Sequence, residues 1–217
     1  MNQYDEFKAM LDAYLKKNQK KASYCSCLHE TSFSDADALY LYDSSRNDIE
    51  VINMDEIAQG AYRNVRFPES NKTEDSIATN DAFVICGDNK WYFIEFKNQK
   101  LNQTKDSVSK KAYGNWHMLL DIIYEMKSTN SLTSFPYDNP IAFARENVIL
   151  ILVVSEEKNP TDAKRIHDGI LAGEKYVPEF LKKLRKYIYH DVFLYTPATL
   201  EQYFVKKFSL RFRRPPK

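Results

Sequence analysis

The sequence predicts an α/β protein, built as one domain around a mixed central sheet with flanking helices. Amphipathic helical periodicity alternates along the chain with short runs of β-branched and aromatic residues. Two neighbouring runs, residues 81–86 and 90–97, carry large apolar side chains at both odd and even positions, which indicates strands covered on both faces. The chain has 217 residues, of which 43% are hydrophobic, so it can bury one sizeable core.

The first part of the chain contains one strong helix signal and several shorter patterns. Residues 3–20 place apolar side chains at helical spacing, and lysines collect at the end where the helix dipole favours cations. Residues 38–43 and 48–53 are short apolar runs joined by polar residues, a pattern typical of a hairpin. A short helix is expected over residues 54–62. Residues 63–80 are polar and poorly periodic, so we expect a loop that carries function.

The rest of the chain contains the strongest strand signals. Residues 81–86 and 90–97 flank Gly87-Asp88-Asn89, which predicts a hairpin at the centre of the sheet. Residues 104–127 repeat apolar side chains every three and four positions, which predicts a long helix across the sheet. The other expected elements are a buried strand over 147–154, a basic helix over 178–190, a strand over 191–195 and a helix over 197–207.

Composition excludes several classes of protein. The chain has 31 Lys and Arg against 30 Asp and Glu, a net charge of +1 that argues against a histone-like arm or an acidic buffer. It has only 5 glycines and no GxGxxG or GxxxxGK motif, which disfavours Rossmann dehydrogenases and P-loop ATPases. No apolar run approaches the roughly 20 residues of a membrane span, and the three cysteines fit a reducing compartment. We therefore expect a cytoplasmic protein that does not engage membranes.

Three charged residues of the predicted hairpin need an explanation, because central strands rarely bury charge. Glu95 and Lys97 are two residues apart, so their side chains leave the same face of the strand. A three-residue loop sets Asp81 directly across from Glu95, whereas a two-residue loop turns it away. We favour the three-residue loop, because Asn89 at its last position tolerates the left-handed conformation that closes such a hairpin.

Two carboxylates and an ammonium at one point are suited to hydrolysis assisted by a metal. Asp81 and Glu95 can hold a hard divalent cation such as Mg²⁺ through oxygen. Lys97 can orient or help to deprotonate a metal-bound water, while the cation neutralises charge that builds on a phosphate. The predicted reaction is the hydrolysis of a phosphodiester bond. The alternative is structural: an ion pair between Glu95 and Lys97 at the exposed end of a strand.

These residues resemble the motif of the PD-(D/E)XK nucleases, the restriction-endonuclease-like superfamily. Asn80-Asp81, then thirteen residues, then Glu95-Phe96-Lys97 have the spacing of that motif, and a hairpin followed by a helix has its order. Asn80 stands where many members have proline. The resemblance covers about residues 54–154, and it implies a restriction-endonuclease-like core with N- and C-terminal additions.

The resemblance also implies roles for individual residues. Asp81 and Glu95 would bind Mg²⁺ or Mn²⁺, and Lys97 would assist the attacking water. Many members carry a further glutamate on a helix ahead of the hairpin. The residues that compete for this position are Glu56, Glu69 and Glu74. Glu56 is slightly favoured because it lies on a predicted helix, although Glu74 is nearer to the hairpin in sequence.

A basic stretch after the motif suggests a polyanionic partner. Its lysines can track phosphates close to the site, or can simply be the solvated start of a helix; they are Lys100, Lys105, Lys110 and Lys111. The expected substrate is nucleic acid, with DNA favoured, and a homodimer would allow both strands of a duplex to be cut. The alternative is a catalytically inactive member of the same architecture that binds nucleic acid or a protein partner.

Overall fold

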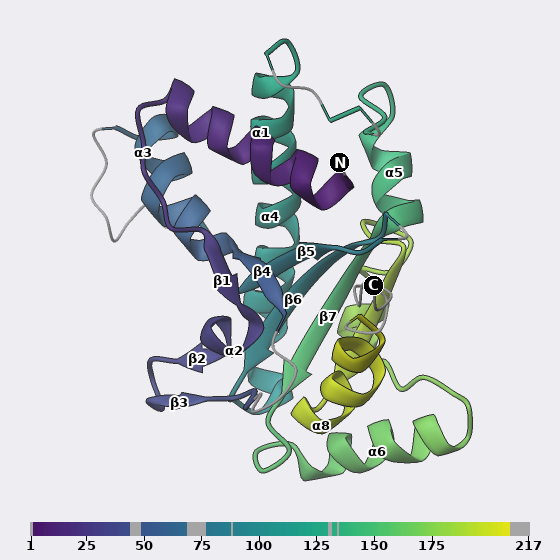
Figure 1. Ribbon diagram of the computed structural model, residues 1–217. Helices are drawn as coiled ribbons and strands as arrows, with labels where there is room; N and C mark the ends of the chain where they lie inside the picture. Colours follow the sequence, from purple (N-terminus) through teal and green to yellow (C-terminus); the bar gives the residue numbers. More distant parts are fainter. Residues whose placement is uncertain are drawn as a thin grey trace, which may run out of the picture.

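A six-stranded mixed sheet organises the structure, which is a computed structural model (Figure 1). It describes residues 2–43, 49–68, 77–87, 89–129, 132–133 and 135–208. The strands are β1 (Cys25–Cys27), β4 (Glu50–Asn53), β5 (Ala82–Ile85), β6 (Trp91–Lys97), β7 (Val148–Val154) and β8 (Asp191–Tyr195), and they lie side by side in that order. Neighbours from β1 to β6 are antiparallel, whereas β6, β7 and β8 are parallel. A mixed sheet with flanking helices was predicted, and this coarse fold class is confirmed.

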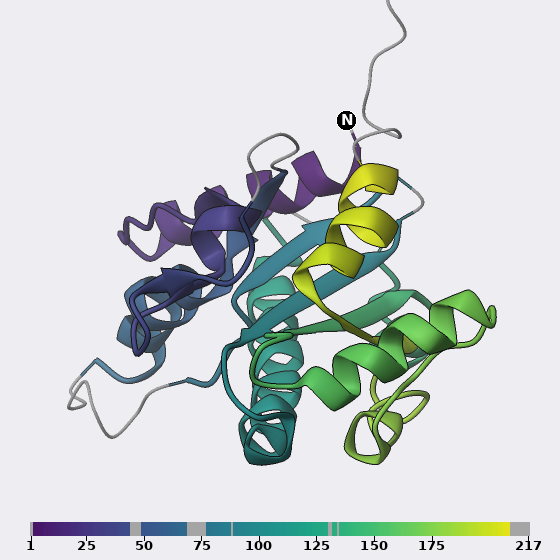
Figure 2. The same ribbon diagram turned by 90° about the horizontal axis from the view of Figure 1, so that it is seen from below.

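Helices cover both faces of this sheet. The helical segments are α1 (Gln3–Lys17), α2 (Leu28–Thr31), η1 (Glu56–Tyr62), α3 (Arg63–Arg66), η2 (Leu101–Gln103), α4 (Lys105–Met126), α5 (Pro140–Asn147), α6 (Pro160–Leu171), α7 (Glu179–Lys182), α8 (Pro197–Leu200) and η3 (Glu201–Val205). α1 and α4 share one apolar core with Phe83 and Phe93, whereas α8 and η3 share the other with Val84 and Ile94 (Figure 2). Alternate residues of β5 and β6 therefore face opposite cores, as predicted. Within the described residues, no helix combines the length and the apolar character that a membrane span requires.

The central hairpin has the predicted three-residue loop. β5 and β6 pair with Ala82 opposite Ile94. The pairing closes where Cys86 N–H donates to Lys90 O at 2.9 Å. Asn89, the last loop residue, has a φ of +59°, the left-handed conformation expected of it. Continued by one residue, this register sets position 81 across from position 95. The middle loop residue, at position 88, lies outside the described residues.

Most of the other expected elements are confirmed with small changes at their ends. The helix expected over 3–20 is α1, which ends at Lys17, and the one expected over 104–127 is α4. The strands expected over 147–154 and 191–195 are β7 and β8. The helix expected over 54–62 is also present, as η1. It continues into α3, so residues 63–66 of the expected loop are helical.

The hairpin expected between residues 38–43 and 48–53 is wrong. β4 pairs with β1 on one side and with β5 on the other. Residues 33–34 and 39–40 form a separate two-stranded ribbon, β2 (Phe33–Ser34) with β3 (Leu39–Tyr40). Burial explains the difference: Val51 and Ile52 of β4 are fully buried and need partners on both sides, whereas both residues of β3 are exposed. The residues expected to join the hairpin, 44–48, lie outside the described part.

The basic helix expected over 178–190 is also largely wrong. Only α7 is helical, and the chain then turns, with Lys186 at a φ of +64°. The buried Tyr189 hydroxyl donates to Ala112 O of α4 at 2.6 Å, which ties this turn to the core. α5 and α6 were not predicted, although Asn139-Pro140 and Asn159-Pro160 are typical helix starts.

Gly114 allows the segment before β5 to pack against the backbone of α4. A Cβ atom at this position would lie 2.4 Å from Ala78 O, a distance that no side chain can accept. Glycine here therefore permits a close approach rather than loosening the helix. The approach brings Asn80 to the part of α4 that carries Lys111 and Asn115.

We expect Gly114→Ala to destabilise the protein by roughly 1–3 kcal/mol, because the added methyl group must push a backbone carbonyl aside. This loss exceeds the gain of about 1 kcal/mol that alanine brings to a helix interior. Urea denaturation measures the change. Gly60→Ala is the matched control, since the nearest atom to its Cβ would be Glu56 Oε2 at 3.9 Å. Equal stability of the two variants would contradict this reading of the contact.

Candidate active site

Asp81 and Glu95 meet where β5 begins and β6 ends. Asp81 Oδ2 accepts a hydrogen bond from Phe96 N–H at 2.6 Å, so its carboxylate is fixed against the neighbouring strand. Glu95 is fully buried, whereas the Asp81 side chain retains 18% exposure. Both carboxylates lie on the side of the sheet that α4 covers. This is the convergence that the three-residue loop predicts.

The ammonium group of Lys111 lies between the two carboxylates. Its Nζ is 3.1 Å from Asp81 Oδ1 and 2.8 Å from Glu95 Oε1. Lys97 Nζ lies 2.7 Å from the same Glu95 Oε1. Two cations thus compensate two carboxylates in a site where an uncompensated charge would be costly. Lys111 was predicted as a contact to nucleic acid, and the structure brings it into the site itself.

Two buried amides complete the surroundings of Glu95. Asn80 Nδ2 donates to Glu95 Oε2 at 3.1 Å, and Asn115 Nδ2 of α4 donates in turn to Asn80 Oδ1. Asn80, which stands where many PD-(D/E)XK proteins have proline, therefore has a polar role that sequence reasoning missed. Its position beside Asp81 is the only signal for it in the sequence.

Asp55, rather than Glu56, lies on the side of the candidate site. Asp55 lies two residues after the last residue of β4. It accepts a hydrogen bond from the buried Thr79 hydroxyl and lines the same pocket as Asp81. Both residues are exposed, but the Glu56 side chain lies toward Gly60 on its own helix and does not line the pocket. Sequence reasoning missed Asp55 by one position, because the phase of η1 relative to the sheet cannot be read from periodicity.

The remaining predicted residues lie outside this cluster or outside the described chain. Lys100, Lys105 and Lys110 are exposed on the segment after β6 and on the first turns of α4. They are available to a polyanion, but none is within the ion-paired group. Glu69 and Glu74 lie outside the described residues.

A pocket of about 250 Å³ opens onto the cluster. Asp55, Asp81 and Lys97 line it, together with residues 98–99 that follow β6. Residues 32–37 and Leu41 line it as well. The charged cluster is therefore open to a ligand and not sealed in the core.

Asn159 holds the segment that follows Lys97. Its side-chain oxygen accepts a hydrogen bond from Leu101 N–H at 2.7 Å, and its Nδ2 donates to Gln99 O at 2.9 Å and to Ser155 O at 3.0 Å. This buried residue joins the ends of β6 and β7. It fixes one wall of the pocket.

Burial and charge together shift the proton affinities in the cluster. Burial first, and then the neighbouring Glu95 carboxylate, raise the pKa of Asp81 to about 7. Burial also raises the pKa of Asp55. For Lys111, burial alone lowers the pKa, but the carboxylates of Glu95 and Asp81 outweigh it and raise the pKa above its ordinary value. Lys111 is therefore a permanent cation, while Asp81 readily accepts a proton.

The two carboxylates fit a divalent cation. Asp81 Oδ1 and Glu95 Oε1 already contact one positive centre, the Lys111 ammonium, so both oxygens can reach the same ion. In the described ranges, no group of three His, Cys, Asp or Glu side chains is placed to hold a metal. A cation here would keep several waters, which is how Mg²⁺ commonly binds to one or two carboxylates.

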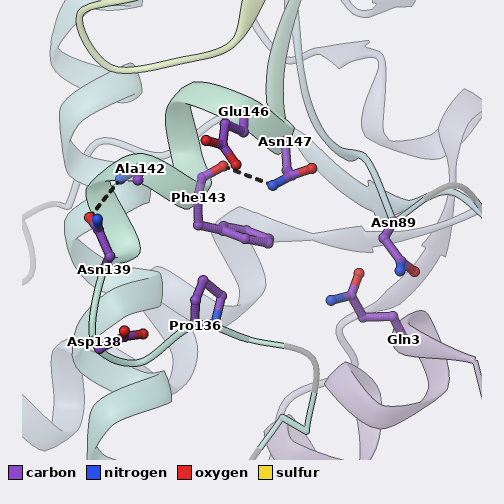
Figure 3. A pocket seen from close by; sticks show the side chains of 9 residues that line it. All are labelled: Gln3, Asn89, Pro136, Asp138, Asn139, Ala142, Phe143, Glu146 and Asn147. Atoms are coloured by element: carbon purple, nitrogen blue, oxygen red, sulfur yellow. Dashed lines mark hydrogen bonds between the residues drawn. The ribbon is translucent and has the colours of Figure 1, made fainter.

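A second pocket, of about 350 Å³, lies at the other end of the hairpin, between α5 and the start of α1 (Figure 3). Its polar side chains serve the local structure. Asn139 Oδ1 caps α5 by accepting from Ala142 N–H at 3.1 Å, and Asn147 Nδ2 donates to Phe143 O at 3.3 Å. The pocket does not join the charged cluster.

Comparison of the chain with protein-family models, with curated proteins and with solved structures finds no match in any of the three. The resemblance to PD-(D/E)XK nucleases therefore depends on the motif residues and on their arrangement in space.

We expect Lys111→Met to destabilise the protein by roughly 3 kcal/mol, because it leaves the buried carboxylates with one cation fewer. Lys110→Met removes the same charge from the exposed neighbouring position and should change stability by less than about 0.5 kcal/mol. Thermal and urea denaturation of both variants measure the difference. Similar losses in the two variants would mean that Lys111 does not stabilise the pair.

The raised pKa of Asp81 predicts how stability depends on pH. The folded chain binds a proton at Asp81 between the ordinary value of 3.8 and about 7, whereas the unfolded chain does not. The free energy of unfolding should therefore fall as pH rises through this window. Asp81→Asn should lack this fall, so it gains on the wild type by roughly 4 kcal/mol between pH 4 and pH 8. Urea denaturation at several pH values tests this, and parallel curves for the two proteins would refute it.

Proposed function

We propose that this chain is a metal-dependent nuclease of the PD-(D/E)XK type, which hydrolyses phosphodiester bonds with DNA as the favoured substrate. One observation carries the proposal: Asp81 and Glu95 contact a single cation, with Lys97 paired to Glu95 beside an open pocket. Ion pairs that only stabilise a strand do not need two carboxylates on one cation at a pocket.

The order of elements supports the same proposal. In the resembled family the aspartate begins one central strand, the Glu-x-Lys triplet ends the next, and the following helix packs behind them. Asp81 precedes β5, Glu95 and Lys97 end β6, and α4 supplies Lys111 from behind. We propose residues 54–154 as the restriction-endonuclease-like core, with α1 to β4 and α6 to η3 as additions.

The residues of this chain would divide the work as follows. Asp81 and Glu95 would hold Mg²⁺ or Mn²⁺, which when bound lowers the pKa of a water and neutralises charge on the scissile phosphate. Lys97 Nζ would orient the attacking water by donating a hydrogen bond to it. Lys111 and the metal would compete for the same carboxylate oxygens.

Asp55 is the residue that we propose in place of the helix glutamate of the family. It lies one position before Glu56, at the start of η1, and the charges of Lys111, Glu95 and Lys97 all act on it. An aspartate there can hold a water or a metal-bound water at the pocket. Glu56 has no such position.

A nuclease assay tests the proposed function. Purified protein should cleave DNA in Mg²⁺ or Mn²⁺ and not in EDTA. Asp81→Asn and Glu95→Gln should abolish cleavage, and Lys97→Ala should reduce it by at least about 100-fold, the usual contribution of a positioned proton-transfer group. Lys164→Ala, an exposed lysine of α6, is the matched control and should cleave normally. Cleavage that persists in EDTA or in Lys97→Ala contradicts the mechanism.

Metal binding can be measured apart from cleavage. Electron paramagnetic resonance of Mn²⁺ should show binding to the wild type that is lost in Glu95→Gln. Binding of metal and of DNA without any cleavage would favour the alternative, a nuclease-like module that only binds nucleic acid. Absence of metal binding would remove the support for both catalytic roles of the carboxylates.

A further inference from the structure

The ribbon β2–β3 presents aromatic rings to solvent. Phe33 is 44% exposed and Tyr40 is 41% exposed, and the two residues are cross-strand partners. Leu39 beside them is also exposed. A two-stranded ribbon is marginally stable on its own, so exposing aromatic rings on it is costly unless they have a use.

The rings are arranged as a short stack. Tyr40 lies parallel to His29, with 4.0 Å between ring centroids and 22° between the planes. Phe33 follows at 4.9 Å from Tyr40, tilted by 54°. The His29 ring is fixed by a 2.7 Å hydrogen bond between Nδ1 and Tyr42 O. His29 therefore covers one face of the Tyr40 ring, while Phe33 and Tyr40 remain accessible to solvent.

The stack adjoins the candidate active site. Phe33 lines the same pocket as Asp81 and Lys97. In Figure 1 the ribbon lies next to the end of the sheet toward which the β7 arrow points, the end that Lys97 occupies. An ion pair from Asp37 to Lys158, at 3.0 Å, holds the ribbon against the residues that follow β7.

The pocket places a cation and an aromatic ring where one ligand can meet both. Lys97 and Phe33 line it, and the carboxylate of Asp37, which also lines it, is already paired with Lys158. A nucleotide in this pocket would therefore direct its phosphate toward Lys97 and its base toward the rings. Base stacking on aromatic side chains needs the face of the base to be uncovered, which a regular duplex does not offer.

We propose that Phe33 and Tyr40 form a stacking platform for an unpaired nucleobase next to the bond that is cut. This inference rests on the proposed nuclease function, and it specifies the substrate: a single strand, or a duplex with unpaired bases at the cleavage point. The pocket volume of about 250 Å³ suits one segment of a polymer rather than a complete small ligand.

Binding measured in EDTA tests the platform without cleavage. The probes are a fluorescently labelled DNA single strand, its duplex, and an abasic strand with the same phosphates. Wild-type protein should bind the intact strand about tenfold more tightly than the abasic strand or the duplex. Phe33→Ala should weaken binding of the intact strand about tenfold and leave the abasic strand unchanged. Phe33→Trp and Tyr40→Phe should retain binding, since both keep a ring.

Phe67→Ala is the matched control, because Phe67 is equally exposed but does not line the pocket. Equal affinity for intact and abasic strands, no binding of either, or an unchanged affinity in Phe33→Ala would each overturn the platform. The two proposals fail separately: base-dependent binding without cleavage in Mg²⁺ contradicts the nuclease, whereas cleavage without base dependence contradicts only the platform.

Discussion

A carboxylate with no access to solvent, that of Glu95, constrains the whole centre of this protein. Such a charge is tolerated only if the fold supplies compensating groups from several directions. β6 supplies Lys97, α4 supplies Lys111, and the segment before β5 supplies Asn80. The close packing at Gly114 and the three-residue hairpin loop make this convergence possible. A side chain at position 114 or a loop of another length parity would separate the groups.

The same compensation gives the site its electrical character. The two carboxylates, Asp81 and Glu95, and the two ammonium groups, Lys97 and Lys111, cancel in net charge within a few ångströms. The raised pKa of Asp81 means that the buried cluster favours the uptake of one more positive charge. A proton on Asp81 supplies such a charge, and the divalent cation that we propose would supply it in the same place.

Local patterns were sufficient to predict the central hairpin, α4 and β7. The hydrophobic periodicity of helices and strands, and the type of a turn, depend on residues close together in sequence. Asn89 alone decided the hairpin register that aligns Asp81 with Glu95. The two strands that pair with β4 could not be predicted in this way. β4 is buried on both faces and pairs with β1 and β5, and not with β3, the preceding strand in sequence. Predicting that Lys111 belongs to the site, and that Asp55 rather than Glu56 faces the pocket, would have required the rotation of each helix relative to the sheet. Asn115 gave no signal and Asn80 gave only its position beside Asp81, because an amide acquires its role only from its partner.

The mixed sheet also affects when the cluster can form. β6 pairs along its full length with β7 in parallel, so Lys97 is held at the last rung, opposite Val154. Parallel neighbours need a long crossover, here containing α4 and α5, and such non-local pairing forms late. During synthesis, Asp81, Glu95 and Lys97 therefore leave the ribosome well before β7 emerges to fix them in place. The cluster assembles only after β7 has been made.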